Sequence, residues 1–285
     1  MTQSLAVQLG YRADEKLVIV NCDDLGSSHA ANLAIHDAMT TGFATSATLM
    51  VPCPWAHEAA KMFRKRDIGV HLTLTAEYPG YRWRALTAAS SLHDADGFLP
   101  HTAAEVWAKA DLHDVEAECR AQIAQALAWG VDVTHLDAHM GTMQLRAPFY
   151  EIYLKLAVEH RLPLRMNGVS KEAQLGFGYR QMAREAGVLF NDYFVLQWGQ
   201  QTRKVLMDVL PNLRPGVTEI CVHPVQDGPE LQGYDKTQAH VRTHDYACVM
   251  DTKLRKMIED AGGKFISFRA VREAMREPAK RYAVS

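Results

Sequence analysis

The chain has 285 residues, 48% of them hydrophobic and 22% charged, which is close to the composition of ordinary globular proteins. Its 31 Lys and Arg residues nearly balance its 33 Asp and Glu residues without a long block of either sign, which argues against nucleic acid or an anionic membrane as a partner. Residues 1–10 lack a basic start, and no stretch approaches the roughly 20 apolar residues of a membrane span, so we expect a cytoplasmic protein with a small substrate.

Strand-like and helix-like segments alternate along the chain. The first half predicts strands at residues 16–22, 45–51 and 68–74 and helices at 28–41 and 55–66. The second half predicts helices at 114–129, 148–160, 200–213 and 244–261 and strands at 133–136, 162–166, 217–222 and 265–268. Strands that alternate with helices form parallel sheets, and about seven such units without an obvious linker favour an α/β fold with a (β/α) barrel.

Two long segments, residues 75–102 and 225–243, interrupt this alternation. Both contain Gly, Pro and aromatic residues, among them Tyr78, Trp83 and Tyr234. Long loops in a compact domain often carry function, so these two are candidate walls of a substrate cleft. The alternative is that their aromatic side chains only anchor the loops to the barrel.

The five cysteines are scattered along the chain, and no two of them form a Cys-x-x-Cys pair. This pattern argues against a thiolate metal site and against redox exchange. We therefore expect the cysteines to be reduced and mostly buried.

The first predicted strand ends in two adjacent carboxylates, Asp23 and Asp24, which are followed by Gly26. Like charges repel each other, and burial raises the cost further unless a cation or a proton lies between them. The pair therefore indicates a metal site or an acid–base site. The alternative is a polar turn that leads into the helix predicted at residue 28.

Further ionisable residues lie at or near the ends of three other predicted strands: His71, His135, Asp137, His139 and His223. In a parallel barrel the carboxyl ends of all strands meet at one rim, where such folds keep their active sites. A lone histidine at a strand end is more often structural. The convergence nevertheless favours a divalent metal site with three ligands, Asp24, His71 and His139.

Strand periodicity puts His135, Asp137 and His139 on one face if the strand extends to residue 139; otherwise His139 lies in the following loop. Asp137 could accept a hydrogen bond from a ligating imidazole and so orient it. His135 fits a structural role as well as a functional one. Neither His135 nor Asp137 is assigned to the metal.

Four segments carry these residues in order: Asn21-Cys22-Asp23-Asp24-Leu25-Gly26, Gly69-Val70-His71-Leu72-Thr73-Leu74-Thr75, His135-Leu136-Asp137-Ala138-His139 and Thr218-Glu219-Ile220-Cys221-Val222-His223-Pro224. Together they resemble the YdjC/ChbG family of carbohydrate deacetylases. The segments 42–51 and Leu162-Pro163-Leu164-Arg165 are similar to that family as well. Each motif alone is weak, but their common order over about residues 16–268 is highly specific.

The resemblance implies a distorted (β/α) TIM-like barrel related to the polysaccharide deacetylases, as a single domain over residues 1–285 with its core at about 16–268. It implies Mg²⁺ or Zn²⁺ at the site and a small carbohydrate as the substrate, with a homodimer left open. The expected reaction is removal of an acetyl group from an N-acetylated sugar or a related small amide. Asp23 would be the base that takes a proton from metal-activated water, and His223 the acid that protonates the departing amine. Arg165 could pair with Asp23 and tune its pKa, or it could form a structural salt bridge.

Two positions depart from the pattern of family members that act on chito-oligosaccharides. Gly141 stands where another histidine is common, and Val225 stands where glycine commonly follows the proline. No proposed ligand, base or acid is lost, so the changes bear on a chitobiose-type substrate rather than on the chemistry. The competing hypotheses are another metal-dependent ester or phosphoester hydrolase on the same scaffold, and a non-catalytic carbohydrate-binding protein.

Overall fold

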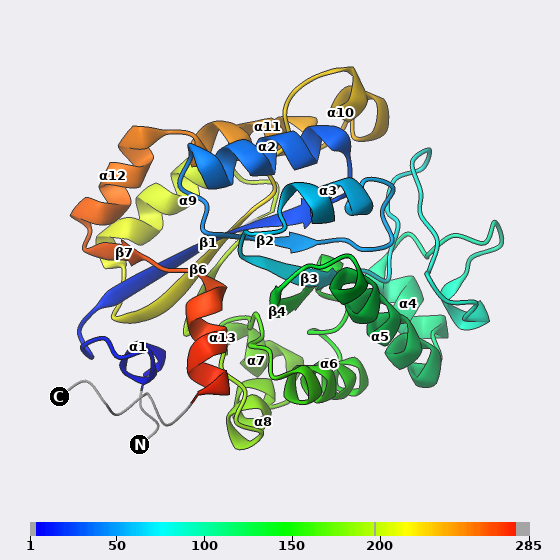
Figure 1. Cartoon of the computed structure of the whole chain (residues 1–285), viewed down its shortest axis with the longest axis horizontal. Helices are drawn as coiled ribbons and strands as arrows, with labels where there is room; N and C mark the ends of the chain where they lie inside the picture. The colour runs from blue at the N-terminus through cyan, green and yellow to red at the C-terminus, as the bar shows by residue number, and fades with distance from the viewer. Residues whose placement is uncertain (1–3, 197, 278–285) are drawn as a thin grey trace.

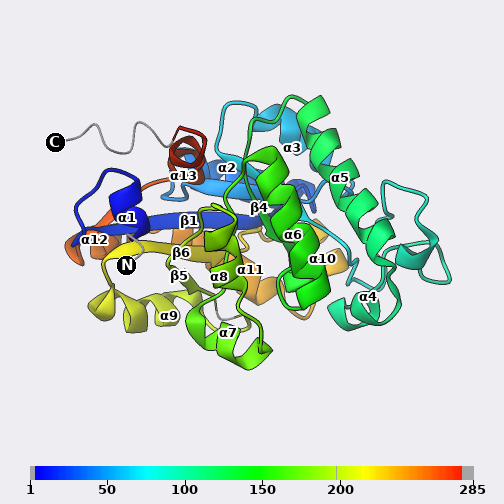
Figure 2. The same ribbon diagram turned by 90° about the horizontal axis from the view of Figure 1, so that it is seen from below.

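Parallel strands form the centre of the molecule. The computed structural model describes residues 4–196 and 198–277, and the strands within them are β1 (Lys16–Leu25), β2 (Ser46–Leu49), β3 (Ile68–Leu72), β4 (Val133–Ala138), β5 (Tyr193–Val195), β6 (Gly216–Val222) and β7 (Gly263–Phe265). Their order is β4-β3-β2-β1-β6-β5, with β7 beside the first residues of β1 (Figure 1; β5 is labelled in Figure 2). Every neighbouring pair is parallel, as the alternation of strands and helices predicts.

The sheet is curled, and isolated bridges made by single residues link the side of β4 to the side of β5. Leu164 forms isolated bridges with Leu136 of β4 on one side and with Phe190, just before β5, on the other. The fold is therefore a distorted, TIM-like (β/α) barrel, which is the predicted fold class.

The strand predicted at residues 162–166 is wrong, because only Leu164 pairs as a strand residue. Pro163 has no N–H to donate to a neighbouring strand. The backbone N–H and C=O of Met166 bond to the side chain of Asn191 instead, at 2.7 and 2.9 Å. No ladder extends from Leu164 in either direction, and the barrel is irregular at this point.

Helices cover the outside of the barrel. They are α1 (Leu5–Gln8), α2 (His29–Thr40), α3 (Ala56–Met62), α4 (Ala103–Lys109), α5 (Leu112–Ala128), α6 (Ala147–His160), α7 (Val169–Leu175), α8 (Tyr179–Glu185), α9 (Thr202–Val209), α10 (Pro229–Tyr234), α11 (Ala239–Val249), α12 (Thr252–Asp260) and α13 (Phe268–Arg276), with 3-10 turns η1 (Ser90–Leu92), η2 (His139–Gly141) and η3 (Leu210–Asn212). Figure 1 shows α2 and α11 on one side and α6 and α13 on the other, and Figure 2 shows α5 beside α6. No helix in the described ranges is long and apolar enough to cross a membrane.

Most predicted helices are confirmed, and two elements near the C-terminus are corrected. The helix predicted at 244–261 is two helices, because Asp251 is extended and caps α12 by accepting the backbone N–H of Lys253. The strand predicted at 265–268 is displaced, since β7 ends at Phe265 and α13 begins at Phe268. Asp67 accepts the backbone N–H of Arg269 at 2.6 Å, which stabilises the first turn of α13 in place of a strand.

The two faces of β1 pack into different parts of the core. Val18 and Val20 belong to the large cluster under the surrounding helices, whereas Leu17 and Ile19 pack in a second cluster that includes Phe268. Burying one such side chain stabilises the fold by about 1.5–3 kcal/mol. The cysteines in the described ranges, at positions 22, 53, 119, 221 and 248, are free and buried, as predicted.

Candidate active site

Asp23 and Asp24 lie within the last part of β1 rather than after it. Neighbouring strand residues point to opposite faces, so a regular strand would separate the two carboxylates. The pairing of β1 with β2 is irregular between Cys22 and Leu25, and Asp24 has φ of 63°, in the left-handed region that Asp tolerates better than most residues. This local break turns both carboxylates toward the same end of the barrel.

Gly26 completes the turn that leaves β1. Its φ is +89°, and a Cβ there would lie 2.9 Å from the Cα of Ala56. Its backbone N–H donates to the Asn32 side chain at 2.8 Å. The Asp-Asp-x-Gly segment is therefore both a turn and part of the site, because the turn requires glycine where the chain packs against α3.

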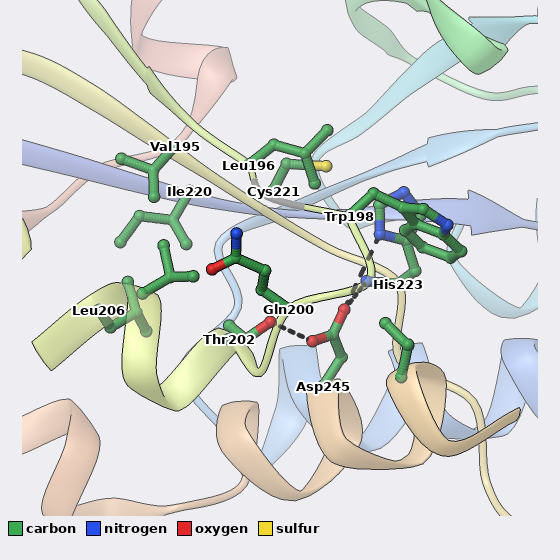
Figure 3. A pocket seen from close by; sticks show the side chains of 12 residues that line it. Val195, Leu196, Trp198, Gln200, Thr202, Leu206, Ile220, Cys221, His223 and Asp245 are labelled. Carbon is green, nitrogen blue, oxygen red and sulfur yellow. Dashed lines mark hydrogen bonds and ion pairs between the residues drawn. The ribbon is translucent and has the colours of Figure 1, made fainter. Parts of the chain in front are cut away.

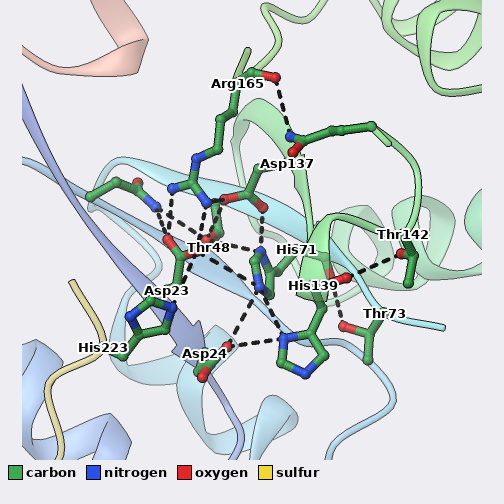
Figure 4. Close-up of polar contacts among 12 residues, drawn as sticks. Asp23, Asp24, Thr48, His71, Thr73, Asp137, His139, Thr142, Arg165 and His223 are labelled. Atoms are coloured by element: carbon green, nitrogen blue, oxygen red, sulfur yellow. Dashed lines mark hydrogen bonds and ion pairs between the residues drawn. The ribbon is translucent and has the colours of Figure 1, made fainter. Parts of the chain in front are cut away.

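Asp24, His71 and His139 come together at the ends of β1, β3 and β4. His71 lies in β3, whereas His139 is the first residue of η2, just after β4. Asp24 Oδ1 is 3.5 Å from His71 Nε2 and 3.3 Å from His139 Nδ1, and the two nitrogens are 3.3 Å apart (Figure 4). These three donor atoms face one another closely enough to hold one divalent cation.

The Asp24 carboxylate fits a metal site because one of its oxygens is free. Oδ2 accepts a hydrogen bond of 2.8 Å from Arg242, but Oδ1 is buried and makes no hydrogen bond within the described residues. A buried oxygen without a partner is costly, and a cation would satisfy it. Burial disfavours charge on the histidines, yet nearby carboxylates raise the pKa of His71 to about 10 and that of His139 to about 9. The point where these atoms meet therefore attracts positive charge.

Asp137 holds the second ring nitrogen of His71. His71 Nδ1 lies 2.5 Å from Asp137 Oδ1, and the Thr48 hydroxyl donates to the other oxygen at 2.9 Å. All three side chains are buried. Asp137 thus lies where a carboxylate would orient a ligating imidazole, with Nε2 of His71 left to face Asp24.

Arg165 binds three carboxylates in the barrel interior. Its guanidinium lies 2.5 and 2.6 Å from the two oxygens of Asp23, 2.9 Å from Asp137 and 2.7 Å from Glu219. Burial would raise the pKa of Asp23, but Arg165 and neighbouring imidazoles hold that pKa well below its usual range, so Asp23 is ionised at neutral pH. Burial instead raises the pKa of Glu219 to about 7. Arg165 therefore both pairs with Asp23 and joins β1, β4 and β6 in one network.

His223 follows β6 and lies next to Asp23. Its Nε2 is 3.8 Å from Asp23 Oδ2, and the same oxygen is 3.9 Å from His71 Nε2. Asp245 of α11 accepts the backbone N–H of His223 at 2.8 Å and lies 3.8 Å from its Nδ1 (Figure 3). The Thr202 hydroxyl also donates to Asp245. Asp245 therefore anchors the backbone of His223, while the ring Nδ1 is buried and makes no hydrogen bond within the described residues.

A cavity of 790 Å³ opens over these residues. Its floor is made by Asp23, Asp24, His71, His139, Arg165 and His223. Its wall is made by residues 77–80 and 233–238, by Arg242 of α11, and by Phe194, Leu196 and Trp198. The volume suits a small organic ligand.

The wall confirms that both long segments line a cleft, and it also shows the alternative packing role of their aromatic residues. Residues 225–243 are not one loop as expected, because they contain α10 and the start of α11. Tyr234 lies with its ring centroid 4.9 Å from that of Tyr78 and stacks on Tyr81 at 5.1 Å. Tyr78 in turn meets Trp83 edge-on at 6.1 Å. The aromatic residues therefore hold the loop after β3 against the end of α10, and some of them also face the cavity.

His135 lies away from the cavity. Its ring stacks on Phe268 with the centroids 3.8 Å apart, and its Nδ1 is 3.0 Å from the Thr134 hydroxyl. Gly69 lies directly against it, since an added Cβ would come within 2.6 Å of the imidazole. The structure thus places His135 in the packed interior of the barrel and not beside the candidate ligands.

The two departures from the family pattern lie in different surroundings. Gly141 lines the cavity, with φ of +67°. Val225 is buried in a small cluster with Ala31, Leu231 and Ala239 and is not a cavity residue. Of the two positions, Gly141 is the one that shapes the space open to a substrate.

Several charged residues of the site had not been singled out from the sequence, among them Glu77, Glu219, Arg242 and Asp245. Glu219 carries a usable signal, because it is a charged residue inside an apolar strand and shares the face of His223 by strand periodicity. Arg242 and Asp245 are three residues apart on α11, which places them on one helix face without indicating what that face meets. Glu77 lies in a loop, where no periodicity applies.

Comparison with known proteins supports a family assignment. A family profile of YdjC-like proteins matches residues 17–260. A carbohydrate deacetylase of Thermus thermophilus is 33% identical over 270 residues, 91% of this chain and 95% of that protein. A chitooligosaccharide deacetylase of Yersinia enterocolitica is 31% identical over 193 residues, 65% of this chain and 68% of that protein.

Solved structures show the same fold. A protein of Enterococcus faecalis V583 proposed to cleave cellobiose phosphate superposes with a TM-score of 0.79 at 24% identity, covering 90% of this chain and 99% of that one. An uncharacterized protein of Agrobacterium tumefaciens superposes with a TM-score of 0.51 at 12% identity, covering 91% of this chain and 90% of that one. With the match to residues 17–260, the chain belongs to the YdjC-like protein family.

Proposed function

We propose that the protein is a metal-dependent hydrolase that removes an acetyl group from an N-acetylated sugar. The observation that carries the proposal is that Asp23 and His223 lie beside the candidate metal ligands at the floor of one cavity. Relatives named carbohydrate deacetylase and chitooligosaccharide deacetylase support the substrate class. We also propose that residues 1–285 act as one domain, since β1 near the start and α11 near the end both contribute to the cavity.

Asp24, His71 and His139 would hold the divalent cation, Mg²⁺ or Zn²⁺. Two imidazoles favour Zn²⁺, whereas the carboxylate suits either ion. Three protein ligands leave positions open for water and substrate. When bound, such a cation polarises the acetyl carbonyl and lowers the pKa of the attacking water.

Asp23 is the proposed base. Its carboxylate is ionised, and hydrogen bonds from Arg165 and from Asn21, at 2.9 Å, fix its orientation. It takes the proton of the water that attacks the acetyl carbon. Because Arg165 makes Asp23 a weak base, its contribution depends on its fixed position beside the candidate ligands.

His223 is the proposed acid. After the water oxygen has bonded to the acetyl carbon, the C–N bond breaks as His223 Nε2 gives a proton to the departing nitrogen, and the products are acetate and a free amine. The 3.8 Å between this nitrogen and Asp23 Oδ2 puts acid and base within reach of one reacting group. Asp245 bonds to the backbone N–H of His223, and its carboxylate lies 3.8 Å from Nδ1 on the other side of the ring.

The competing functions fit the site less well. A phosphoester hydrolase needs cationic groups that are free to bind phosphate. Arg165 and Arg242 are already paired with buried carboxylates. Within the described residues, the cationic side chains of the cavity that are left for phosphate are Lys171 and Lys236 of the wall. A carbohydrate-binding protein without turnover has no use for an ionised carboxylate and an imidazole beside the metal ligands.

The test of the proposal is acetate release by the purified protein. We expect acetate from at least one N-acetylated mono- or disaccharide with Mg²⁺, Zn²⁺ or Co²⁺, and none after chelation. Asp24→Asn should lose the metal, as measured by elemental analysis, and the activity with it. The absence of acetate from every sugar tested with metal-loaded protein would contradict the proposal, and parallel assays with acetyl esters and phosphoesters separate it from the competing hydrolases.

A further inference from the structure

Glu77 holds the outer ring nitrogen of one candidate metal ligand. It lies in the loop after β3, and its Oε2 is 3.0 Å from His139 Nε2. The opposite nitrogen, Nδ1, faces Asp24 Oδ1 and His71 Nε2, each at 3.3 Å. The side chains of Glu77 and His139 are 21% and 7% exposed, so water competes weakly for this hydrogen bond.

His71 shows the same arrangement with its two ring nitrogens exchanged. Its Nε2 faces Asp24, and its Nδ1 meets Asp137. Each imidazole therefore presents one nitrogen to Asp24 and the other to a carboxylate. A carboxylate in this position accepts the ring N–H, leaves the lone pair on the opposite nitrogen for a metal, and fixes the ring orientation.

We propose that Glu77 is a positioning residue that makes His139 a metal ligand through Nδ1. The inference rests on the proposed metal site and extends its machinery to the wall loop. Rotating the His139 ring by 180° would put carbon atoms toward both Asp24 and Glu77 and would lose both contacts. Glu77 therefore selects one ring orientation and one tautomer, with the proton on Nε2.

The same loop supports a second candidate ligand. The Tyr78 hydroxyl accepts a hydrogen bond of 2.6 Å from Arg242, which donates to Asp24 Oδ2 at 2.8 Å. Oδ2 is thereby occupied, and Oδ1 is left for the cation. Because Tyr78, Pro79 and Gly80 also line the cavity, one segment both faces the substrate space and orients two of the three ligands.

The test compares Glu77→Ala and Glu77→Gln with the wild type, using Zn²⁺ alone as the probe. The Zn²⁺ affinity of Glu77→Ala, measured by competition with a chelator, should fall by about 10- to 100-fold. Glu77→Gln keeps an amide oxygen that can accept the Nε2 proton, so its affinity should fall less. NMR spectra of the histidine rings in Zn²⁺-loaded protein should show Nδ1 ligation by His139 in the wild type and in Glu77→Gln, and its loss in Glu77→Ala.

Asp94→Asn is the matched control. Asp94 lies in the same loop and binds Arg82 and two backbone N–H groups, but it does not contact His139. Its Zn²⁺ affinity should equal that of the wild type, and a loss as large as that of Glu77→Ala would assign the effect to the loop in general. If Glu77→Ala kept both the Zn²⁺ affinity of the wild type and Nδ1 ligation by His139, the role of Glu77 would be overturned, and the proposed metal site would stand. The metal site itself would be overturned if the wild type did not bind Zn²⁺, or if Asp24→Asn bound it as tightly as the wild type.

Discussion

The floor and the wall of the cavity are built from different parts of the fold. Strand ends, or residues directly after them, supply most of the floor, where the charged groups are buried and paired with one another. Loops, α11 and the side chains of Phe194, Leu196 and Trp198 supply the wall, which is richer in aromatic side chains. A parallel barrel brings its strand ends to one rim, but it leaves the paths of its loops open. The barrel strands therefore position the reactive groups, and the segments that connect the strands shape the cavity around those groups.

Removing the base should produce the largest effect at the floor. Asp23→Asn keeps the shape of the side chain but cannot accept a proton at neutral pH, so kcat for acetate release should fall by about 10²- to 10⁴-fold. The bound metal should remain, because Asp23 is not one of the three proposed ligands. Activity and metal content are measured on the same preparation. Loss of the metal together with activity would place Asp23 among the ligands instead.

The strand-end residues of the floor could be predicted because the order of elements determines where strand ends lie. Alternating strands and helices predict a parallel barrel, and its carboxyl ends meet at one rim. This reasoning alone brings Asp24, His71 and His139 close together. It does not explain how Asp23 and Asp24 can both face the site, because the left-handed φ of 63° at Asp24 arises from the folded chain and not from any spacing.

The wall could not be predicted to the same degree. Glu77 lies in a loop whose path depends on packing between Tyr78 and Tyr234, which are far apart in the sequence. Arg242 and Asp245 share a helix face, but helical spacing does not tell which element that face contacts. Contacts of this kind depend on tertiary packing, so they escape reasoning from local patterns.

Substitution of Arg165 tests whether the buried charged groups of the floor also stabilise the fold. Arg165→Met leaves three carboxylates in the barrel interior without their cation, and the free energy of unfolding should fall by about 3–5 kcal/mol. Arg120→Met is the control, because its ion pairs lie near the surface and should contribute about 1 kcal/mol or less. Denaturant unfolding at pH 7 measures both. An equally small loss for both variants would mean that the buried carboxylates take up protons when the cation is removed, with Glu219 the first to do so.

The wall should give the smallest effect, confined to substrate binding. Trp198 lines the cavity, is 44% exposed, and meets His223 edge-on with the ring centroids 4.6 Å apart. An exposed indole beside the proposed acid offers an apolar face for a sugar ring. Trp198→Ala should raise KM by up to about tenfold, the equivalent of a typical aromatic contact, with kcat little changed, and Trp198→Phe should restore part of the affinity. A fall in kcat instead would show that Trp198 positions His223. Trp198 would then belong with the reactive floor and not with the substrate-binding wall.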